Sequence, residues 1–237
     1  LHQKSLLALP LADGSRRYDR WQKGQDARSK GKLAKLLYWK TPIWRPDPFL
    51  DRTVRYVRWL FSTPAMWVWA ITLAVTVWQL SGRFDELWGG MSSLLGMSNL
   101  PLLWLTLVGL KTVHELGHAY SCKALGGEVP EIGVALIVGT PCAYVDASAS
   151  WKFERPSRRG AVALAGMYVE SIVACLAAWV WLFSPEGLVR DAAQNVIVLA
   201  SVVTVLFNIN PLVRFDGYYV LSDLTGVPNL RQRASWQ

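Results

Sequence analysis

Long apolar runs with few charges dominate the chain beyond its first quarter. A helix of about 20 apolar residues crosses the hydrocarbon core of a bilayer. Four segments approach this length and composition, and they are residues 59–82, 101–125, 160–183 and 192–211. The pattern therefore predicts an all-α polytopic membrane protein with about four transmembrane helices.

The segment between the second and third runs has a different pattern. Residues 128–148 are rich in Val, Ile, Gly and Pro, and their apolar centre is too short to cross a bilayer. We interpret this stretch as a short strand-like or re-entrant segment. A cytoplasmic loop that packs on the helices explains the same pattern equally well.

Composition and charge support a membrane setting. Apolar residues make up 52% of the 237 residues and charged residues 18%, whereas a typical soluble domain has about 25% charged residues. Residues 1–58 hold 14 Lys and Arg against 5 Asp and Glu. This favours a basic cytoplasmic or interfacial segment held by anionic headgroups, and we expect no nucleic acid partner. Within it, residues 31–39 and 49–59 interleave basic and apolar positions as interfacial helices do.

The loops between the runs predict an orientation. The segment before the first run and the loop between the second and third are rich in Lys and Arg, while the other two loops hold one each. This alternation predicts a multi-pass protein of the inner (cytoplasmic) membrane with both termini of the chain cytoplasmic. We expect the membrane core to span residues 59–225 and a further cytoplasmic segment to start at residues 226–237. Because the chain begins with Leu1, we expect a piece of a longer protein.

One motif carries candidate chemistry. Two of the three histidines, His114 and His118, stand in the sequence HELGH within the second run. Histidines four positions apart project from one helix face, so both can bind one Zn²⁺, and the intervening glutamate Glu115 can accept a proton from a zinc-activated water. A buried polar contact between helices is the alternative explanation of this polar stripe.

Two histidines leave a catalytic zinc one protein ligand short. Asp216 follows the fourth run, and the second and fourth runs are expected to end at the same face of the membrane. Asp216 is therefore our preferred third ligand, with Glu128 and Glu131 as alternatives. The three cysteines (Cys122, Cys142 and Cys175) form no paired spacing, and we interpret them as packing residues.

The two motifs HELGH and NINPLVRFDG together resemble the site-2 protease family of intramembrane zinc metalloproteases. Phe215 replaces the Leu usual in the second motif, and ALAGMYVE resembles a further segment of the family with Met167 and Glu170 in place of Pro and Asn. Residues at both ends of the core resemble a bacterial subgroup of large membrane peptide zinc metalloproteases.

The resemblance implies a role for each matching residue. His114, His118 and Asp216 would bind zinc, and Glu115 would be the general base. Residues Asn208 and Asn210 of the second motif would bind the substrate or the oxyanion. Alternatively, these two amides cap the end of the fourth helix.

Glu170 is the one carboxyl group within the third run. An intramembrane carboxyl is a candidate functional group, and pairing with Lys111 or with a loop arginine is the structural alternative. No cofactor other than Zn²⁺ is expected.

These features predict a zinc metalloendopeptidase that hydrolyses transmembrane or membrane-associated peptides. A peptide-export or adaptor component, in which the metal site serves maturation or assembly, is the alternative function. A membrane anchor with a vestigial metal site is a third.

Overall fold

The computed structural model describes residues 38–89, 94–137, 140–211 and 215–225. The chain divides into two compact units, one of residues 1–40 with 135–141 and one of residues 41–134 with 142–237. All described helices belong to the second unit. Most of the predicted basic segment and the predicted C-terminal cytoplasmic segment lie outside the described residues.

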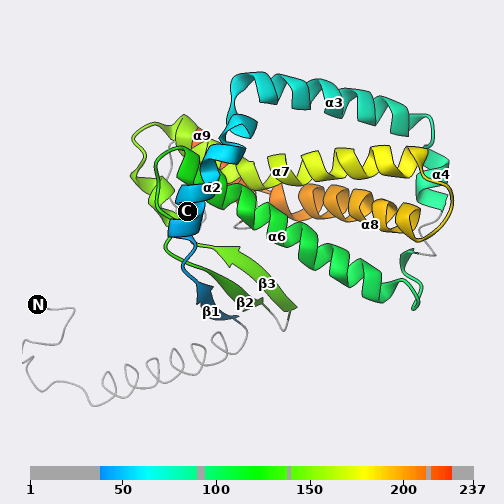
Figure 1. Cartoon of the computed structure of the whole chain (residues 1–237), viewed down its shortest axis with the longest axis horizontal. Coiled ribbons are helices and arrows are strands. Elements are labelled where there is room, and N and C mark those ends of the chain that lie inside the picture. The colour runs from blue at the N-terminus through cyan, green and yellow to red at the C-terminus, as the bar shows by residue number, and fades with distance from the viewer. Residues whose placement is uncertain (1–37, 90–93, 138–139, 212–214, 226–237) are drawn as a thin grey trace, which may run out of the picture. The chain divides into compact units, whose positions relative to one another are not determined.

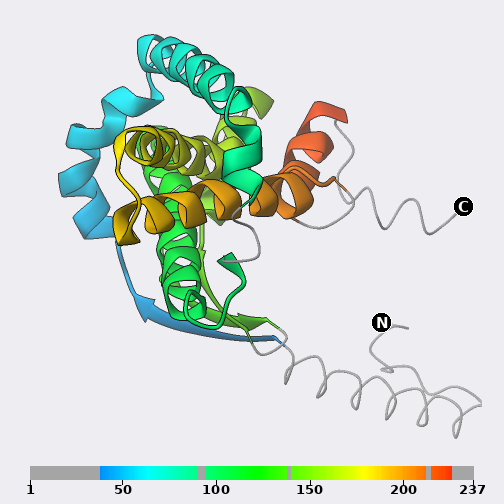
Figure 2. The same cartoon turned by 90° about the vertical axis from the view of Figure 1, so that its right-hand side faces the viewer.

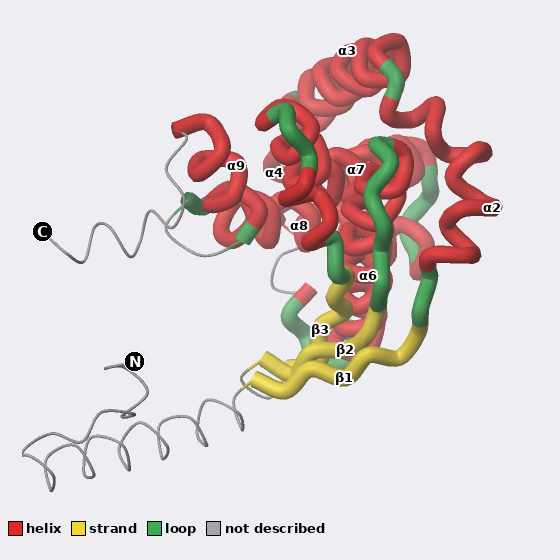
Figure 3. Tube along the Cα trace, turned by 90° about the vertical axis from the view of Figure 1, so that its left-hand side faces the viewer, coloured by secondary structure: helices red, strands yellow, loops and turns green. Residues whose placement is uncertain are grey.

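Helices make up most of the described chain (Figures 1 and 3). The α-helices are α2 (Asp47–Val57), α3 (Thr63–Ser81), α4 (Phe84–Gly89), α6 (Leu100–Ala124), α7 (Pro156–Phe183), α8 (Leu188–Val203) and α9 (Asp216–Thr225). Shorter turns are η2 (Arg58–Phe61), η3 (Ser148–Lys152) and the π-helical η4 (Thr204–Asn208). Strands β1 (Tyr38–Trp44), β2 (Ile132–Ile137) and β3 (Thr140–Val145) form one sheet in the order β1-β2-β3.

The strand-like segment expected between the second and third runs is present as β2 and β3. The prediction of a mostly helical protein is confirmed, but strand β1, which joins this sheet beside β2, was not expected. Residues 38 and 39 of the predicted helix over residues 31–39 begin β1, whose sequence YWKTPIW is rich in aromatic and β-branched residues that favour strands. The helix predicted within residues 49–59 is present as α2.

Within the part of the chain that the structure describes, three helices are long and apolar enough to cross a membrane: α3, α7, and α8 with its continuation through η4. The second predicted span corresponds to α6, which is 25 residues long, but Lys111, Glu115 and Lys123 interrupt its apolar surface. Four spans are therefore not confirmed. The first predicted span, α3, begins at Thr63 rather than at residue 59, because Ser62 caps the helix and Pro64 follows in its first turn.

The central helix of the second unit is α7, which packs against α3, α6, α8 and α9. Figure 1 shows α6 and α8 running in the same direction beside α7, and α4 at the opposite end of the helices from the start of α7. Figure 2 shows α9 following the end of α8. As a result, the C-terminal end of α6 and the start of α9 reach the same end of the helix group.

An ion pair and hydrogen bonds hold helix α2 against the end of α6. Asp47 accepts hydrogen bonds from Lys123 Nζ at 2.8 Å and from the backbone N–H of Val129 at 2.8 Å. Burial alone would raise the pKa of Asp47, but these two contacts lower it below its ordinary value. Nearby, Leu50 of α2 is buried with Ala119 and Cys122 of α6. These contacts hold α2 against the half of α6 that carries the histidines.

Candidate metal centre

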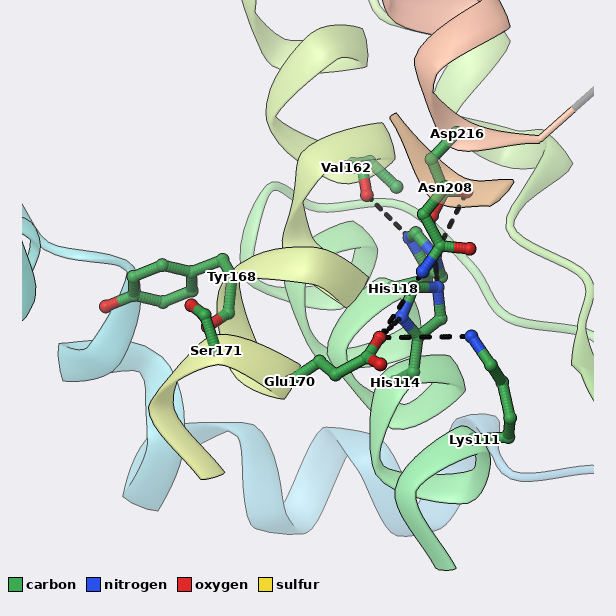
Figure 4. Close-up of polar contacts among 9 residues, drawn as sticks. All are labelled: Lys111, His114, His118, Val162, Tyr168, Glu170, Ser171, Asn208 and Asp216. Atoms are coloured by element: carbon green, nitrogen blue, oxygen red, sulfur yellow. Dashed lines mark hydrogen bonds and ion pairs between the residues drawn. The ribbon is translucent and has the colours of Figure 1, made fainter. Parts of the chain in front are cut away.

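Two histidines from one helix form the centre of the candidate site. His114 and His118 lie four positions apart on α6, so both imidazoles project from one face of the helix. Their Nε2 atoms are 3.1 Å apart, and both side chains are buried. Figure 4 shows the pair with its polar partners.

Each imidazole is held through its other ring nitrogen. Nδ1 of His118 lies 2.8 Å from the carbonyl oxygen of Val162, and Nδ1 of His114 lies 2.6 Å from Glu170 Oε2. Because a carbonyl and a carboxylate only accept, both Nδ1 atoms are assigned as donors. In the neutral imidazoles the two Nε2 atoms then carry the lone pairs, which is the tautomer that binds a metal through Nε2.

A carboxylate from a distant part of the sequence completes the cluster. Asp216 begins α9, with Oδ2 3.0 Å from His114 Nε2 and Oδ1 3.4 Å from His118 Nε2. One ligand atom from each of the three residues lies within 4.8 Å of the others. Positive charge on the two imidazoles, from protons or from a bound cation, would keep this carboxylate ionised, and a carboxylate must be ionised to bind a metal.

These groups fit a divalent cation. The two Nε2 lone pairs converge on one carboxylate, and Asp216 Oδ2 is buried without accepting a hydrogen bond. Converging acceptors are unfavourable unless a proton or a cation compensates them. Two imidazoles and one carboxylate are a known ligand set of catalytic zinc that leaves a position open, and the set also suits other divalent transition metals.

Two glycines let the helices come close enough to form the cluster. A Cβ atom at Gly166 of α7 would lie 2.5 Å from Nε2 of both His114 and His118. On the other side, a Cβ at Gly217 would clash with the backbone carbonyl of Ile209. Glycine at position 166 therefore allows α7 to approach the histidine pair, and glycine at position 217 allows the start of α9 to pack against the backbone at Ile209.

Replacing Gly166 with alanine is expected to weaken zinc binding at least about tenfold, the lower end of the loss caused by disturbing the surroundings of a metal ligand. The new methyl group would displace imidazoles whose Nδ1 atoms are already fixed. The matched control is Gly160→Ala, because Gly160 also lies on α7 and has open space where the methyl group would be. Zinc competition with a chelator measures the effect, and equal affinities in the two variants would contradict the packing argument.

The carboxyl group of Glu170 is fully buried on α7. Besides His114, its Oε2 atom lies 3.9 Å from Lys111 Nζ and 3.3 Å from Asn208 Nδ2, which donates to it. The two roles considered for Glu170 therefore meet at one atom, since it contacts Lys111 and also orients a candidate metal ligand. Such carboxylate–histidine contacts fix the ring and increase the basicity of the ligand.

If Glu170 positions His114, Glu170→Gln is expected to lower zinc affinity by about 10–100-fold while the protein stays folded. The amide oxygen can still accept from Nδ1, but it lacks the negative charge. Zinc affinity and the melting temperature of the metal-free protein should be measured together, with the exposed Glu186→Gln as control. A lower melting temperature with unchanged zinc affinity would assign Glu170 to structural pairing with Lys111 alone.

Glu115 lies beside the histidine pair and faces a cavity of about 280 Å³. His118 and Asp216 line the same cavity, as do Arg159 and Asp223, whose side chains form an ion pair at 2.9 Å. One carboxylate oxygen of Glu115, Oε2, accepts a hydrogen bond of 2.9 Å from the backbone N–H of Val145 at the end of β3. This contact fixes the orientation of the carboxylate.

The two predicted substrate residues, Asn208 and Asn210, form hydrogen bonds within the protein. Asn208 donates to Glu170, and Asn210 Nδ2 donates to the carbonyl of Leu206 one turn earlier, as a capping amide does. Neither lines the cavity of Glu115.

Glu128 and Glu131, the alternative third ligands, line a different cavity near α2. Among the described residues, the cluster that can hold a metal therefore contains Asp216 and neither glutamate.

Sequence reasoning did not identify the backbone contacts of the site. The Val162 carbonyl and the Val145 N–H have no signal in residue type. Gly166 did have a signal in the sequence, because the small residues of ALAG in an apolar helix indicate close helix packing.

Three side chains from the motifs HELGH and NINPLVRFDG lie together in this structure, namely His114, His118 and Asp216. Comparisons with protein-family models, curated proteins and solved structures find no match to this chain.

Proposed function

We propose that this chain is the core of an intramembrane zinc metalloprotease that hydrolyses membrane-embedded or membrane-delivered peptides. The observation that carries the proposal is the convergence of His114 Nε2, His118 Nε2 and the Asp216 carboxylate beside a cavity that also holds Glu115. When bound, Zn²⁺ would supply a Lewis acid that polarises the peptide carbonyl and makes water nucleophilic at neutral pH.

Residues of this chain would hold the metal ligands in place and transfer the proton. His114 and His118 present Nε2 lone pairs because Glu170 and the Val162 carbonyl take their Nδ1 protons. Glu115 would accept the proton of the attacking water and return it to the leaving amine. The Val145 N–H holds one carboxylate oxygen, which leaves the other oxygen of Glu115 for this transfer.

The sheet offers a means of holding the substrate. A transmembrane helix hides its peptide carbonyls in its own hydrogen bonds, so it must unwind before hydrolysis. Strand β3 is at one edge of the sheet order, and its end at Val145 contacts Glu115. Adding an unwound segment to this edge would bring an extended peptide toward Glu115.

Cleavage of a fluorescently labelled transmembrane peptide by the purified full-length protein in vesicles tests the proposal. We expect cleavage that stops with 1,10-phenanthroline, continues with its non-chelating 1,7 isomer and returns on addition of Zn²⁺. Metal analysis of the purified protein identifies the resident ion. Unchanged cleavage by metal-free protein would overturn the proposal.

We also propose a multi-pass location in the inner membrane with both termini of the chain cytoplasmic. Reporter fusions should place residues 40 and 155 on the cytoplasmic side and residue 86 on the opposite side. The alternation of Lys and Arg among the loops motivates this orientation. Helix α4, which contains residue 86, and the start of α7, which follows residue 155, lie at opposite ends of the helices in Figure 1. A periplasmic signal at residue 155 would contradict the orientation.

A further inference from the structure

A second cavity lies beside α7, on the side that faces away from the histidine pair. Its volume is about 880 Å³, and its walls come from η2, α3, α6, α7 and the region of η4. Tyr168 and Ser171 line it, and Figure 4 shows both pointing away from the histidines while Glu170 points toward them. Helix α7 therefore lies between this cavity and the metal centre.

Tyr168, Trp69 and Ser171 of the cavity wall already form hydrogen bonds within the protein. The Tyr168 hydroxyl donates to the carbonyl of Leu60 at 2.7 Å, and Trp69 Nε1 donates to Ser171 Oγ at 2.9 Å. Most of the remaining wall is hydrocarbon, including Phe61 and Leu164. A ligand that fills this cavity must therefore be mainly apolar, and the volume lies within the range of ligand pockets.

Among the described residues that line the cavity, Arg58 is the one with a charged side chain. Arg58 is exposed and forms no ion pair among the described residues. It stands between the amphipathic helix α2 and the apolar helix α3, next to Trp59, which is 63% exposed. Exposed tryptophan and arginine at the start of an apolar helix are typical of the headgroup region, where basic pockets bind anionic lipid headgroups.

We propose that this cavity binds one anionic phospholipid, with an acyl chain against α3 and α7 and the headgroup phosphate at Arg58. Charge complementarity at the rim and a hydrocarbon interior both fit this ligand. A transmembrane peptide helix, about 10 Å across, fits less well, because the Tyr168–Leu60 and Trp69–Ser171 hydrogen bonds join the two walls. The site does not depend on protease activity.

Intact-protein mass spectrometry of the full chain in detergent tests this site. The protein is mixed with equal amounts of palmitoyl-oleoyl phosphatidylglycerol and phosphatidylcholine, and retained lipid is counted. We expect one retained phosphatidylglycerol and little phosphatidylcholine. Arg58→Gln should lower this preference about fivefold, since one arginine near a membrane surface contributes about 1 kcal/mol to the binding of anionic lipid.

Arg55→Gln is the matched control, because Arg55 is exposed on α2 but does not line the cavity.

A second experiment fills the cavity. Ala161→Trp should prevent retention of either lipid, and Leu164→Trp serves the same purpose if the first variant does not fold. Equal lipid retention in the filled variant and the wild type would overturn the proposal. So would an equal effect of Arg55→Gln and Arg58→Gln, or displacement of the lipid by a transmembrane peptide.

Discussion

Replacing Glu115 with glutamine is expected to leave zinc bound and to lower the rate of peptide cleavage by about 10²–10⁴-fold, the usual contribution of a general base. The proposed zinc ligands are untouched by the change. The glutamine oxygen can still accept the hydrogen bond from the Val145 N–H, so the local structure should persist. What is lost is the ability to take a proton from water.

Metal content and single-turnover cleavage of the purified variant measure the two effects separately. Glu128→Gln is the control, because Glu128 is an exposed carboxylate outside the cavity of Glu115. It should cleave like the wild type. Wild-type turnover in Glu115→Gln would remove Glu115 from the mechanism, and loss of zinc in this variant would assign it a role in metal binding instead.

The apolar pattern predicted the helices well because membrane-length helices need long runs of a single character. It predicted their ends less well. The fourth run was expected to begin at residue 192, whereas α8 begins at Leu188 after Gly187, which has a φ of 144°. Such a turn is set by backbone conformation that favours glycine rather than by apolarity.

Strand β1 and the status of α6 show what the pattern could not decide. The YWKTPIW segment was expected to be partly helical, and its strand depends on pairing with β2, which is distant in sequence. Helix α6 is long enough to cross a membrane, but its polar stripe makes it less apolar than the other long helices. Whether α6 lies within the bilayer depends on its packing against α7 and α8, which composition does not record.

Part of the candidate site could be predicted from the sequence, and part could not. The i, i+4 spacing predicts that His114 and His118 share a helix face, because this follows from helix geometry alone. The position of Asp216 beside them required a topological argument about parallel helices, and the structure brings the three groups together. The dependence of His114 on Glu170 required tertiary contacts between α6 and α7, so the sequence left the role of Glu170 open.

Replacing Asp216 is expected to abolish zinc binding and cleavage together. A bound metal would lose one of three ligands, so the loss of affinity should exceed the about 10–100-fold cost of removing an outer partner. Asp216→Asn keeps the size of the side chain and removes its charge, while Asp216→Ala removes the ligand atoms as well. Both variants should lose zinc if the carboxylate binds the metal.

The choice of control decides how this result is interpreted. Asp223 is the nearest carboxylate on α9, but it pairs with Arg159 at 2.9 Å and lines the same cavity as Asp216, so it is not neutral. Asp191→Ala is the better control, because Asp191 is exposed at the start of α8. It should retain zinc and activity. Full zinc occupancy in Asp216→Ala would show that zinc binding does not require Asp216, and it would overturn the proposed ligand role.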